Sequence, residues 1–274
     1  MSVAEAIARG ELRGRLWFYT NYHCNIACKY CLTESRPQAP RRLLDETLLL
    51  TCAQEARDLG FLDFGVTGGE PFLRPDMTSI LRQLASIRPT LVLTNGTLFS
   101  DRLIDEMRTL AHLPVAVQFS LDSSDEKRND AMRDDGTHRN VVAAIPRLKQ
   151  LGIRVRIGST VDEEDPDSIA RLRQFVANLG VDADDHIIRP IARVGRAETN
   201  DLGIAVSQDN IVPELTLTAE GAFLSPAAPF VKDDRLDIRM LLTRVIQPVA
   251  IPAAAMLRFV SGHRTPSEVR ITCA

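Results

Sequence analysis

The sequence predicts an α/β protein, a partial (βα)6 barrel with parallel strands followed by a small C-terminal lobe that contains a β-hairpin. Three observations support this. Six short apolar or β-branched runs lie between residues 16 and 191, amphipathic segments separate them, and the pattern changes after residue 198. Strands that alternate with helical segments are typical of βα units around a parallel sheet. A chain of 274 residues is long enough for one such barrel.

Runs rich in β-branched and aromatic residues mark the strands. They are expected at residues 16–20, 63–67, 90–94, 116–121, 154–160 and 186–191. In a barrel of parallel strands, the loops that follow the strands meet at one face, where ligands bind. The residues directly after each run are therefore the first candidates for a functional site.

Helices are expected where a capping residue precedes apolar residues that share one face. Asp45 precedes such a segment, and Gly60 follows it as a left-handed terminator. The other helices begin after Asp76, after Ser100 and at Pro166. Residues 140–151 are also periodic, but Pro146 within them predicts a kinked or split helix, because proline lacks the backbone donor.

The C-terminal part follows a different pattern. Residues 215–224 alternate around Glu220 and Gly221, which indicates a β-hairpin. We therefore expect two parts, a barrel core at residues 1–198 and a small lobe at residues 199–274 that covers the substrate.

Composition excludes several classes of protein. The net charge of -3 and the pI near 6.0 indicate no nucleic-acid partner and no anionic membrane surface. Charged residues interrupt the N-terminal apolar runs, and residues 245–260 are too short and too broken by proline to span a bilayer. We expect a cytoplasmic protein, in which clustered cysteines bind metal more often than they form disulfides.

Three of the five cysteines lie in one short loop after the first strand, at Cys24, Cys28 and Cys31. Three thiolates can hold an iron-sulfur cluster and leave one iron open to another ligand, as a catalytic metal site requires. Two other interpretations remain at this point. The cysteines and His23 can form a zinc site, or a C-x-x-C pair can act as a redox pair.

Polar residues follow the next three strands as well. The second strand ends in Thr67-Gly68-Gly69-Glu70-Pro71, where glycines allow a ligand to approach the backbone and Glu70 offers an acceptor to an ammonium group. Thr94 and Asn95 end the third strand, and Ser120 and Asp122 lie at the end of the fourth. Their hydroxyl, amide and carboxylate groups can bind ribose hydroxyls and a carboxylate, although helix capping also explains Asp122.

The C-x-x-x-C-x-x-C triplet, with Tyr30 before its third cysteine, and the G-G-E-P segment together resemble the signature of the radical S-adenosylmethionine (SAM) enzymes. The resemblance implies a [4Fe-4S] cluster on Cys24, Cys28 and Cys31, whose open iron binds SAM and whose electron cleaves it to a 5'-deoxyadenosyl radical. It implies that Gly68, Gly69 and Glu70 hold the amino group of SAM. The other SAM-binding residues that it implies are Tyr30 and the Ile188 backbone at the adenine, Arg133 at the carboxylate, and Thr94, Asn95, Ser120 and Asp122.

The T-N-G and S-L-D-S segments are similar to those of the branch that includes the molybdopterin-precursor enzyme and the peptide-modifying SPASM enzymes. The C-terminal lobe here lacks the cysteines that hold auxiliary clusters in SPASM enzymes. Cys52 is predicted to be a buried apolar side chain of a helix. Cys273, the penultimate residue, is predicted to be exposed and disordered.

The leading functional hypothesis is a radical SAM enzyme that abstracts hydrogen from a peptide or a small metabolite. Its reaction subclass and catalytic residues are open. Such an enzyme also needs an electron donor such as flavodoxin or ferredoxin. The alternatives are a barrel that binds SAM or a cluster without turnover, and a zinc or redox-thiol protein.

Overall fold

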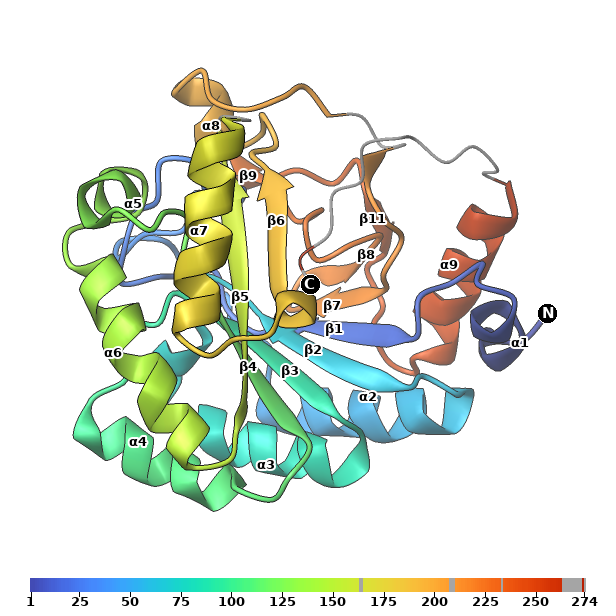
Figure 1. Cartoon of the computed structure of the whole chain (residues 1–274). Coiled ribbons are helices and arrows are strands. Elements are labelled where there is room, and N and C mark those ends of the chain that lie inside the picture. The colour runs from blue at the N-terminus through green and yellow to red at the C-terminus, as the bar shows by residue number, and fades with distance from the viewer. Residues whose placement is uncertain (163–164, 207–209, 233, 263–272, 274) are drawn as a thin grey trace.

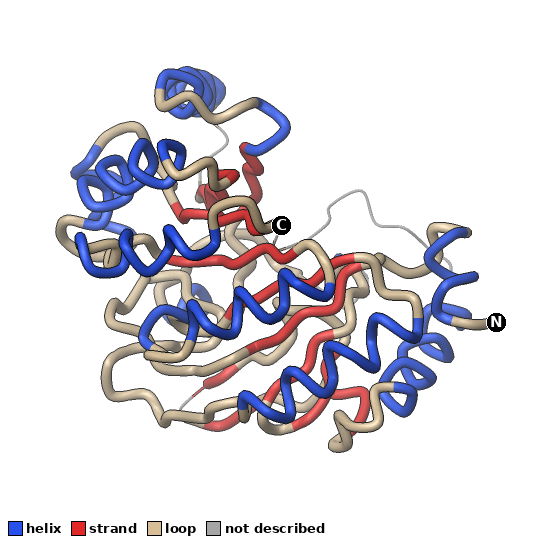
Figure 2. Tube along the Cα trace, turned by 90° about the horizontal axis from the view of Figure 1, so that it is seen from below, coloured by secondary structure: helices blue, strands red, loops and turns tan. Residues whose placement is uncertain are grey.

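The computed structural model describes residues 1–162, 165–206, 210–232, 234–262 and 273. A curved nine-stranded sheet forms the centre, and helices lie along its outer side (Figures 1 and 2). The strand order is β11-β8-β7-β1-β2-β3-β4-β5-β6. The predicted α/β architecture of a partial barrel is confirmed.

The six predicted strands are present, each within one residue of its expected ends. They are β1 (Arg15–Tyr19), β2 (Asp63–Thr67), β3 (Thr90–Thr94), β4 (Val115–Ser120), β5 (Arg154–Val161) and β6 (His186–Pro190). Each pairs in parallel with the next. Their C-terminal ends therefore meet at one face, as the functional hypothesis requires.

Side chains alternate between the two faces of the sheet. On β1, Leu16 and Phe18 are fully buried in the main hydrophobic core against the helices. Trp17 points to the opposite, concave face, where its ring lies against Gly65 of β2 so closely that a Cβ at that position would overlap it. The concave face is thus the barrel interior, and the helix side holds most of the core.

The helices are α1 (Val3–Ala8), α2 (Glu46–Leu59), α3 (Met77–Ile87), α4 (Asp101–Met107), α5 (Glu126–Met132), α6 (Thr137–Gln150), α7 (Pro166–Asn178), α8 (Arg196–Thr199) and α9 (Ala250–Gly262). Short 3-10 turns lie at η1 (Pro71–Leu73), η2 (Arg108–Leu110) and η3 (Ala183–Asp185). Asp45 caps α2 as predicted, and Gly60 ends it in the left-handed conformation. Asp76 makes no cap hydrogen bond, because its carboxylate binds Arg74 instead.

Of the two outcomes expected at Pro146, a kinked or a split helix, the split does not occur. Helix α6 is continuous through this residue. Pro146 is exposed, whereas Val141, Ile145 and Leu148 are buried on the opposite side. Packing of the apolar face holds the helix together, and solvent can bind the carbonyl that the proline leaves unpaired.

The predicted hairpin is formed by β7 (Thr216–Thr218) and β8 (Gly221–Phe223). β7 also pairs in parallel with β1, and β11 (Leu241–Thr243) pairs with β8, so the hairpin extends the barrel sheet. A separate small ribbon consists of β9 (Val231–Lys232) and β10 (Arg235–Leu236). The boundary near residue 198 stays a prediction, but the two parts share one sheet and one hydrophobic core.

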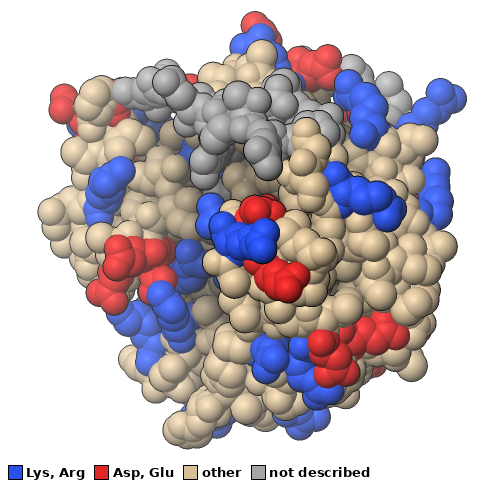
Figure 3. All heavy atoms as spheres, turned by 90° about the vertical axis from the view of Figure 1, so that its right-hand side faces the viewer, with Lys and Arg blue, Asp and Glu red and all other residues tan. Residues whose placement is uncertain are grey.

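The surface face in Figure 3 carries basic and acidic side chains that are interspersed. Across the part of the chain that the structure describes, no helix combines the length and apolar character needed to cross a membrane.

Candidate functional site

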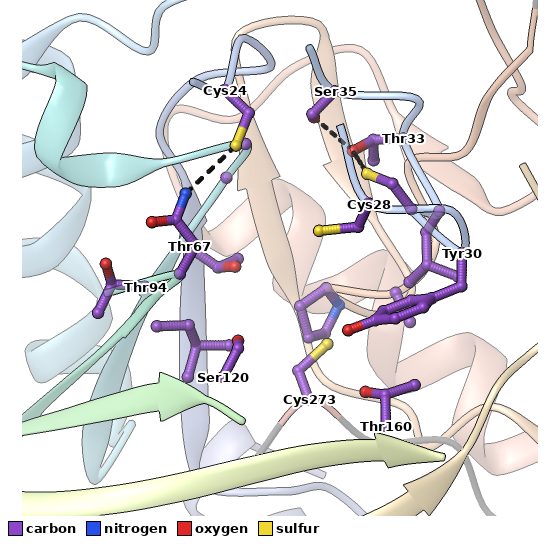
Figure 4. Close-up of a pocket in the computed structure, with 18 of the residues that line it drawn as sticks. Cys24, Cys28, Tyr30, Thr33, Ser35, Thr67, Thr94, Ser120, Thr160 and Cys273 are labelled. Carbon is purple, nitrogen blue, oxygen red and sulfur yellow. Dashed lines mark hydrogen bonds between the residues drawn. The ribbon is translucent and has the colours of Figure 1, made fainter. Parts of the chain in front are cut away.

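A cavity of about 190 Å³ opens where the C-terminal ends of the barrel strands meet (Figure 4). The side chains of the three loop cysteines all line it. The predicted site residues that line this cavity are Cys24, Cys28, Cys31, Tyr30, Gly68, Gly69, Thr94, Asn95, Ser120 and Arg133. Glu70, Asp122 and Ile188 are not among the lining residues. Residues far apart in the sequence thus converge on one space.

Each of the three thiols has a different polar neighbour. The Asn95 amide nitrogen donates to the Cys24 sulfur at 3.5 Å. The Arg133 guanidinium lies 4.0 Å from the Cys28 sulfur, and the Thr33 hydroxyl lies 3.6 Å from the Cys31 sulfur. Donors next to thiolate sulfurs stabilise the negative charge that metal ligation requires.

A zinc site requires three or four ligand side chains around one ion. Among the residues that the structure describes, no three Cys, His, Asp or Glu side chains converge on one point. A single zinc ion needs such convergence, whereas a cluster offers a separate iron to each thiolate. His23, the fourth ligand in the zinc hypothesis, is buried and does not line the cavity.

The thiols of Cys24 and Cys28 lie in a poorly solvated environment. Burial raises the pKa of Cys28 to about 12, and it also raises the pKa of Cys24 well above its usual value. In the absence of metal these thiols are therefore protonated at neutral pH. Metal binding must release their protons, so burial alone would oppose loading and the metal must compensate.

The cysteine loop is held from outside the first βα unit. Arg196 of α8 donates to the Cys28 carbonyl at 2.8 Å and to the Ser35 carbonyl. The backbone N–H of Arg196 donates to the Cys31 carbonyl at 3.0 Å, and Asn200 donates to the Lys29 carbonyl at 2.8 Å. These contacts bind the loop after β6 to the loop after β1. Sequence reasoning missed this role of Arg196, because nothing local to it indicates which carbonyls it contacts.

The glycines of the G-G-E-P segment allow a close approach to the cysteine loop. The Gly69 N–H donates to the Asn21 carbonyl at 2.7 Å. A Cβ at Gly69 would overlap the backbone oxygens of His23 and Tyr22. Only glycine therefore fits at this position without moving the loop that carries the cysteines.

Glu70 is fully buried, and its carboxylate is turned into the protein. One oxygen accepts from the Phe72 N–H at 3.0 Å and the Thr94 hydroxyl at 2.9 Å, and the other accepts from the Asn95 N–H at 2.8 Å. Burial raises the pKa of Glu70 to about 7, although the hydrogen bonds from Asn95 and Phe72 lower it. In this arrangement Glu70 positions the end of β3.

Arg133 and Asp122 form a buried ion pair at the wall of the cavity. Two guanidinium nitrogens of Arg133 donate to the two Asp122 oxygens, at 2.7 and 3.3 Å. Asp122 also accepts from the Thr160 N–H at 2.8 Å and from the Tyr30 hydroxyl. The Arg133 guanidinium lies 5.5 Å from the centre of the Tyr30 ring. Asp122 therefore fixes Arg133 and Tyr30, while Asp125 takes the capping role of α5.

Other predicted residues lie elsewhere, or play parts that the sequence did not indicate. The Ile188 side chain packs against the main core. Cys52 is fully buried on α2, as predicted. The expectation for Cys273 was wrong, because it is half-buried and lines the cavity, with its thiol directed inward (Figure 4). Lining residues to which sequence reasoning gave no role include Thr33, Thr160 and Arg189.

A family model described as "Radical SAM superfamily" matches residues 19–176, more than half of the chain. The chain belongs to the radical SAM superfamily. The match contains the three loop cysteines and ends within α7.

Curated relatives of this radical SAM protein act on different substrates, to judge from their names. The subtilosin biosynthesis protein AlbA of Bacillus subtilis is 32% identical over 168 residues, covering 61% of this chain and 37% of AlbA. GTP 3',8-cyclase 1 of Mycobacterium tuberculosis is 28% identical over 170 residues, covering 58% of this chain and 46% of the cyclase. The chain thus spans less than half the length of these relatives.

Solved structures share the fold at low sequence identity. Streptococcus suis SuiB bound to S-adenosylmethionine has a TM-score of 0.58 at 19% identity, covering 69% of this chain and 44% of SuiB. The enzyme anSMEcpe with bound AdoMet and the Cp18Cys peptide has a TM-score of 0.64 at 11% identity, covering 93% of this chain and 84% of anSMEcpe.

We expect Asp122→Ala to lower the free energy of unfolding by about 3 to 5 kcal/mol, because it leaves a buried guanidinium without its partner. The side chains of Arg133 and Asp122 are only 6% and 5% exposed. Chemical denaturation of the protein without SAM measures the effect. Asp105→Ala is the matched control, since Arg108 and Asp105 form an exposed pair whose loss should cost about 0 to 1 kcal/mol. Equal losses in the two variants would contradict the prediction.

We expect Glu70→Gln to change how stability depends on pH. The folded protein holds the Glu70 proton up to about pH 7. The unfolded chain releases it near the usual carboxyl pKa of about 4.3. The free energy of unfolding therefore falls as pH rises between these two values. Glutamine does not titrate, so the variant should lose less stability than the parent between about pH 5 and about pH 8. Denaturant titrations at both pH values test this, with the exposed Glu126→Gln as control. Parallel pH curves for parent and Glu70→Gln would refute it.

Proposed function

We propose that this protein is a radical SAM enzyme whose [4Fe-4S] cluster is held by Cys24, Cys28 and Cys31. The observation that carries the proposal is the placement of these three thiols on one cavity together with the Gly68-Gly69 turn. Membership of the superfamily supports it. The separate polar neighbours of the three sulfurs fit ligands of three different irons.

We propose that SAM binds beside the cysteines, along the ends of β2, β3 and β4. Gly68, Gly69, Thr94, Asn95 and Ser120 line this part of the cavity and offer backbone and side-chain hydrogen-bond partners. When bound, the cluster supplies the electron that cleaves SAM to methionine and a 5'-deoxyadenosyl radical, which abstracts hydrogen from an organic substrate.

Arg133, Asp122 and Tyr30 form the opposite wall in this proposal. Arg133 keeps a donor toward Cys28 and the cavity while Asp122 holds the rest of its guanidinium. A fixed guanidinium is suited to a carboxylate, because less side-chain freedom is lost when it binds. Glu70 acts as a positioning residue, which orients Thr94 and Asn95 rather than contacting SAM.

For the substrate we propose a peptide. AlbA is named as a biosynthesis protein of the bacteriocin subtilosin and SkfB as a maturation protein of the sporulation killing factor, and SuiB is solved with its precursor peptide SuiA. A small molecule is the second candidate, since GTP 3',8-cyclases are also relatives. Residues 199–274 are proposed to cover the barrel mouth, because Pro226, Ala227 and Cys273 line the cavity. An external donor such as flavodoxin or ferredoxin would supply the electron, in the cytoplasm.

Two other functions would use the same residues. A barrel that binds SAM or a cluster without turnover keeps the cofactor contacts but has no substrate reaction. A zinc or redox-thiol protein uses the thiols alone and gives no reason for the Gly68-Gly69 turn to share their cavity. The following experiments separate these alternatives from the proposed enzyme.

Anaerobically reconstituted protein should hold one cluster, about four iron and four sulfide per chain. Alanine at Cys24, Cys28 or Cys31 should abolish most of this content, because each thiolate is a ligand. Cys52→Ala is the matched control and should retain it, since Cys52 is fully buried in the helix layer. Iron and sulfide analysis with the absorbance spectrum measures the content. A colourless protein with stoichiometric zinc would contradict the cluster.

Dithionite-reduced protein should convert SAM to methionine and 5'-deoxyadenosine, slowly without substrate, as chromatography of the products would show. Ser120→Ala should weaken SAM binding by about 0.5 to 1.5 kcal/mol, the contribution of one hydrogen bond. Ser86→Ala, an exposed serine of α3, should bind SAM like the parent. Cluster-loaded protein that binds SAM but never cleaves it would support the non-catalytic alternative.

A further inference from the structure

Gln118 of β4 is a buried polar side chain inside the barrel. It is only 3% exposed, and its amide nitrogen donates to the backbone carbonyl of Cys273 at 2.9 Å. Its amide oxygen is also buried and has no hydrogen-bond partner among the residues that the structure describes. A buried acceptor without a partner destabilises a protein, so its presence points to a ligand that supplies a donor.

Arg189 of β6 contacts the same carbonyl group. One of its terminal nitrogens donates to the Cys273 oxygen at 2.8 Å, and its Nε donates to the Thr160 hydroxyl at 3.3 Å. Arg189 is the register partner of Thr160 on β5. Donors from β4 and β6, on either side of β5, therefore converge on one peptide carbonyl.

The contacts of Gln118 and Arg189 with the Cys273 carbonyl lie next to the cavity that the loop cysteines line. Gln118 precedes Ser120 by two residues on β4, so the two side chains share the concave face. Ser120, Thr160, Arg189 and Cys273 all line the cavity. Gly158 on β5 leaves room for the Gln118 amide, which would lie 2.7 Å from a Cβ there.

We propose that Gln118 and Arg189 form a subsite that binds the backbone N–H and carbonyl of one substrate residue, and that the Cys273 carbonyl occupies it until substrate displaces it. The proposal rests on the proposed peptide-modifying function and deepens it. In a trans peptide bond the N–H and the C=O point in opposite directions, so the two groups that Gln118 can bind together belong to the two peptide bonds that flank one residue. The Gln118 N–H donates to the carbonyl of that residue, and the Gln118 oxygen accepts from its N–H. Arg189 adds a charge-assisted bond to the carbonyl.

The same chemistry disfavours other occupants. A free carboxylate satisfies Arg189, but it leaves the Gln118 oxygen without a donor. A tertiary amide has a carbonyl but no N–H, and it leaves the same oxygen unpaired. Of these occupants, only a residue with both a backbone N–H and a carbonyl satisfies Gln118 and Arg189 together, and a peptide chain repeats this pair.

Cys273 reports on occupancy of this subsite, because its thiol lies in the cavity and burial raises its pKa to about 11. The experiment uses the full chain, reconstituted under anaerobic conditions, and measures the rate of Cys273 alkylation by iodoacetamide with peptide mapping. N-acetylalanine N'-methylamide, which presents two secondary amides, should raise this rate at least about threefold at saturation by displacing the Cys273 carbonyl. N-acetylproline N',N'-dimethylamide, which has carbonyls but no amide N–H, should leave it unchanged.

Gln118→Met removes the amide and keeps the length of the side chain. It should raise the basal alkylation rate of Cys273 and abolish the effect of the methylamide. Arg189→Lys, which retains one charged donor, should give an intermediate rate. Gln174→Met on the exposed face of α7 is the matched control and should behave like the parent.

Equal effects of the two amides would overturn the proposal, since recognition would not involve the peptide N–H. It would also be overturned if SAM alone exposed Cys273 and Gln118→Met weakened SAM binding, because the subsite would then belong to SAM. The readout needs no turnover, and mapping resolves each cysteine. A protein that fails to cleave SAM but shows the predicted alkylation pattern would therefore lose the proposed function while retaining the subsite.

Discussion

The buried hydrogen bonds of Asn21 and Glu70 join the loops that follow β1, β2 and β3. Asn21 donates to the His23 and Glu70 carbonyls at 2.9 and 3.0 Å, and its own carbonyl accepts from Gly69. The Glu70 carboxylate then binds the Asn95 backbone, and the Asn95 side chain reaches Cys24. One polar chain thus runs from the strand ends to the first thiol. Because these groups are buried, apart from the half-buried Gly69, removing one leaves partners unsatisfied, and the position of Cys24 depends on the whole set.

A second set of contacts holds the other end of the cysteine loop. Arg196 and Asn200 follow β6, the last strand of the parallel series, and they bind carbonyls of the loop that follows β1, the first. The Lys29 N–H donates to the Met132 carbonyl at the end of α5. A partial barrel has no strand pairing between its first and last parallel strands, so these loop contacts take the place of closure on this face. The three thiols are therefore positioned by elements from most of the barrel.

The interior of this barrel is polar for a packed core, and two of its arginines are paired with carboxylates at the wall. Arg133 is matched by Asp122, and Arg156 on β5 lies 3.3 Å from Asp185. Such pairs contribute little net stability, because burial costs about as much as the attraction returns. They do fix the direction of the side chains. A cavity with fixed donors loses less entropy when a polar ligand binds, which is the property that a SAM and substrate site requires.

Local sequence patterns are sufficient to predict the architecture and many of the residues that line the cavity. Strands and helices depend on local periodicity and caps such as Asp45, and the order of βα units dictates that the loops with Cys24, Gly69 and Asn95 meet. Tertiary structure alone decided what each polar side chain contacts. Glu70 is turned inward because three donors surround its carboxylate. Helix α6 is continuous at Pro146 because its opposite face is packed. Cys273 lies in the cavity because Gln118 and Arg189 bind its carbonyl. These outcomes depend on partners that are distant in sequence, and no local pattern encodes them.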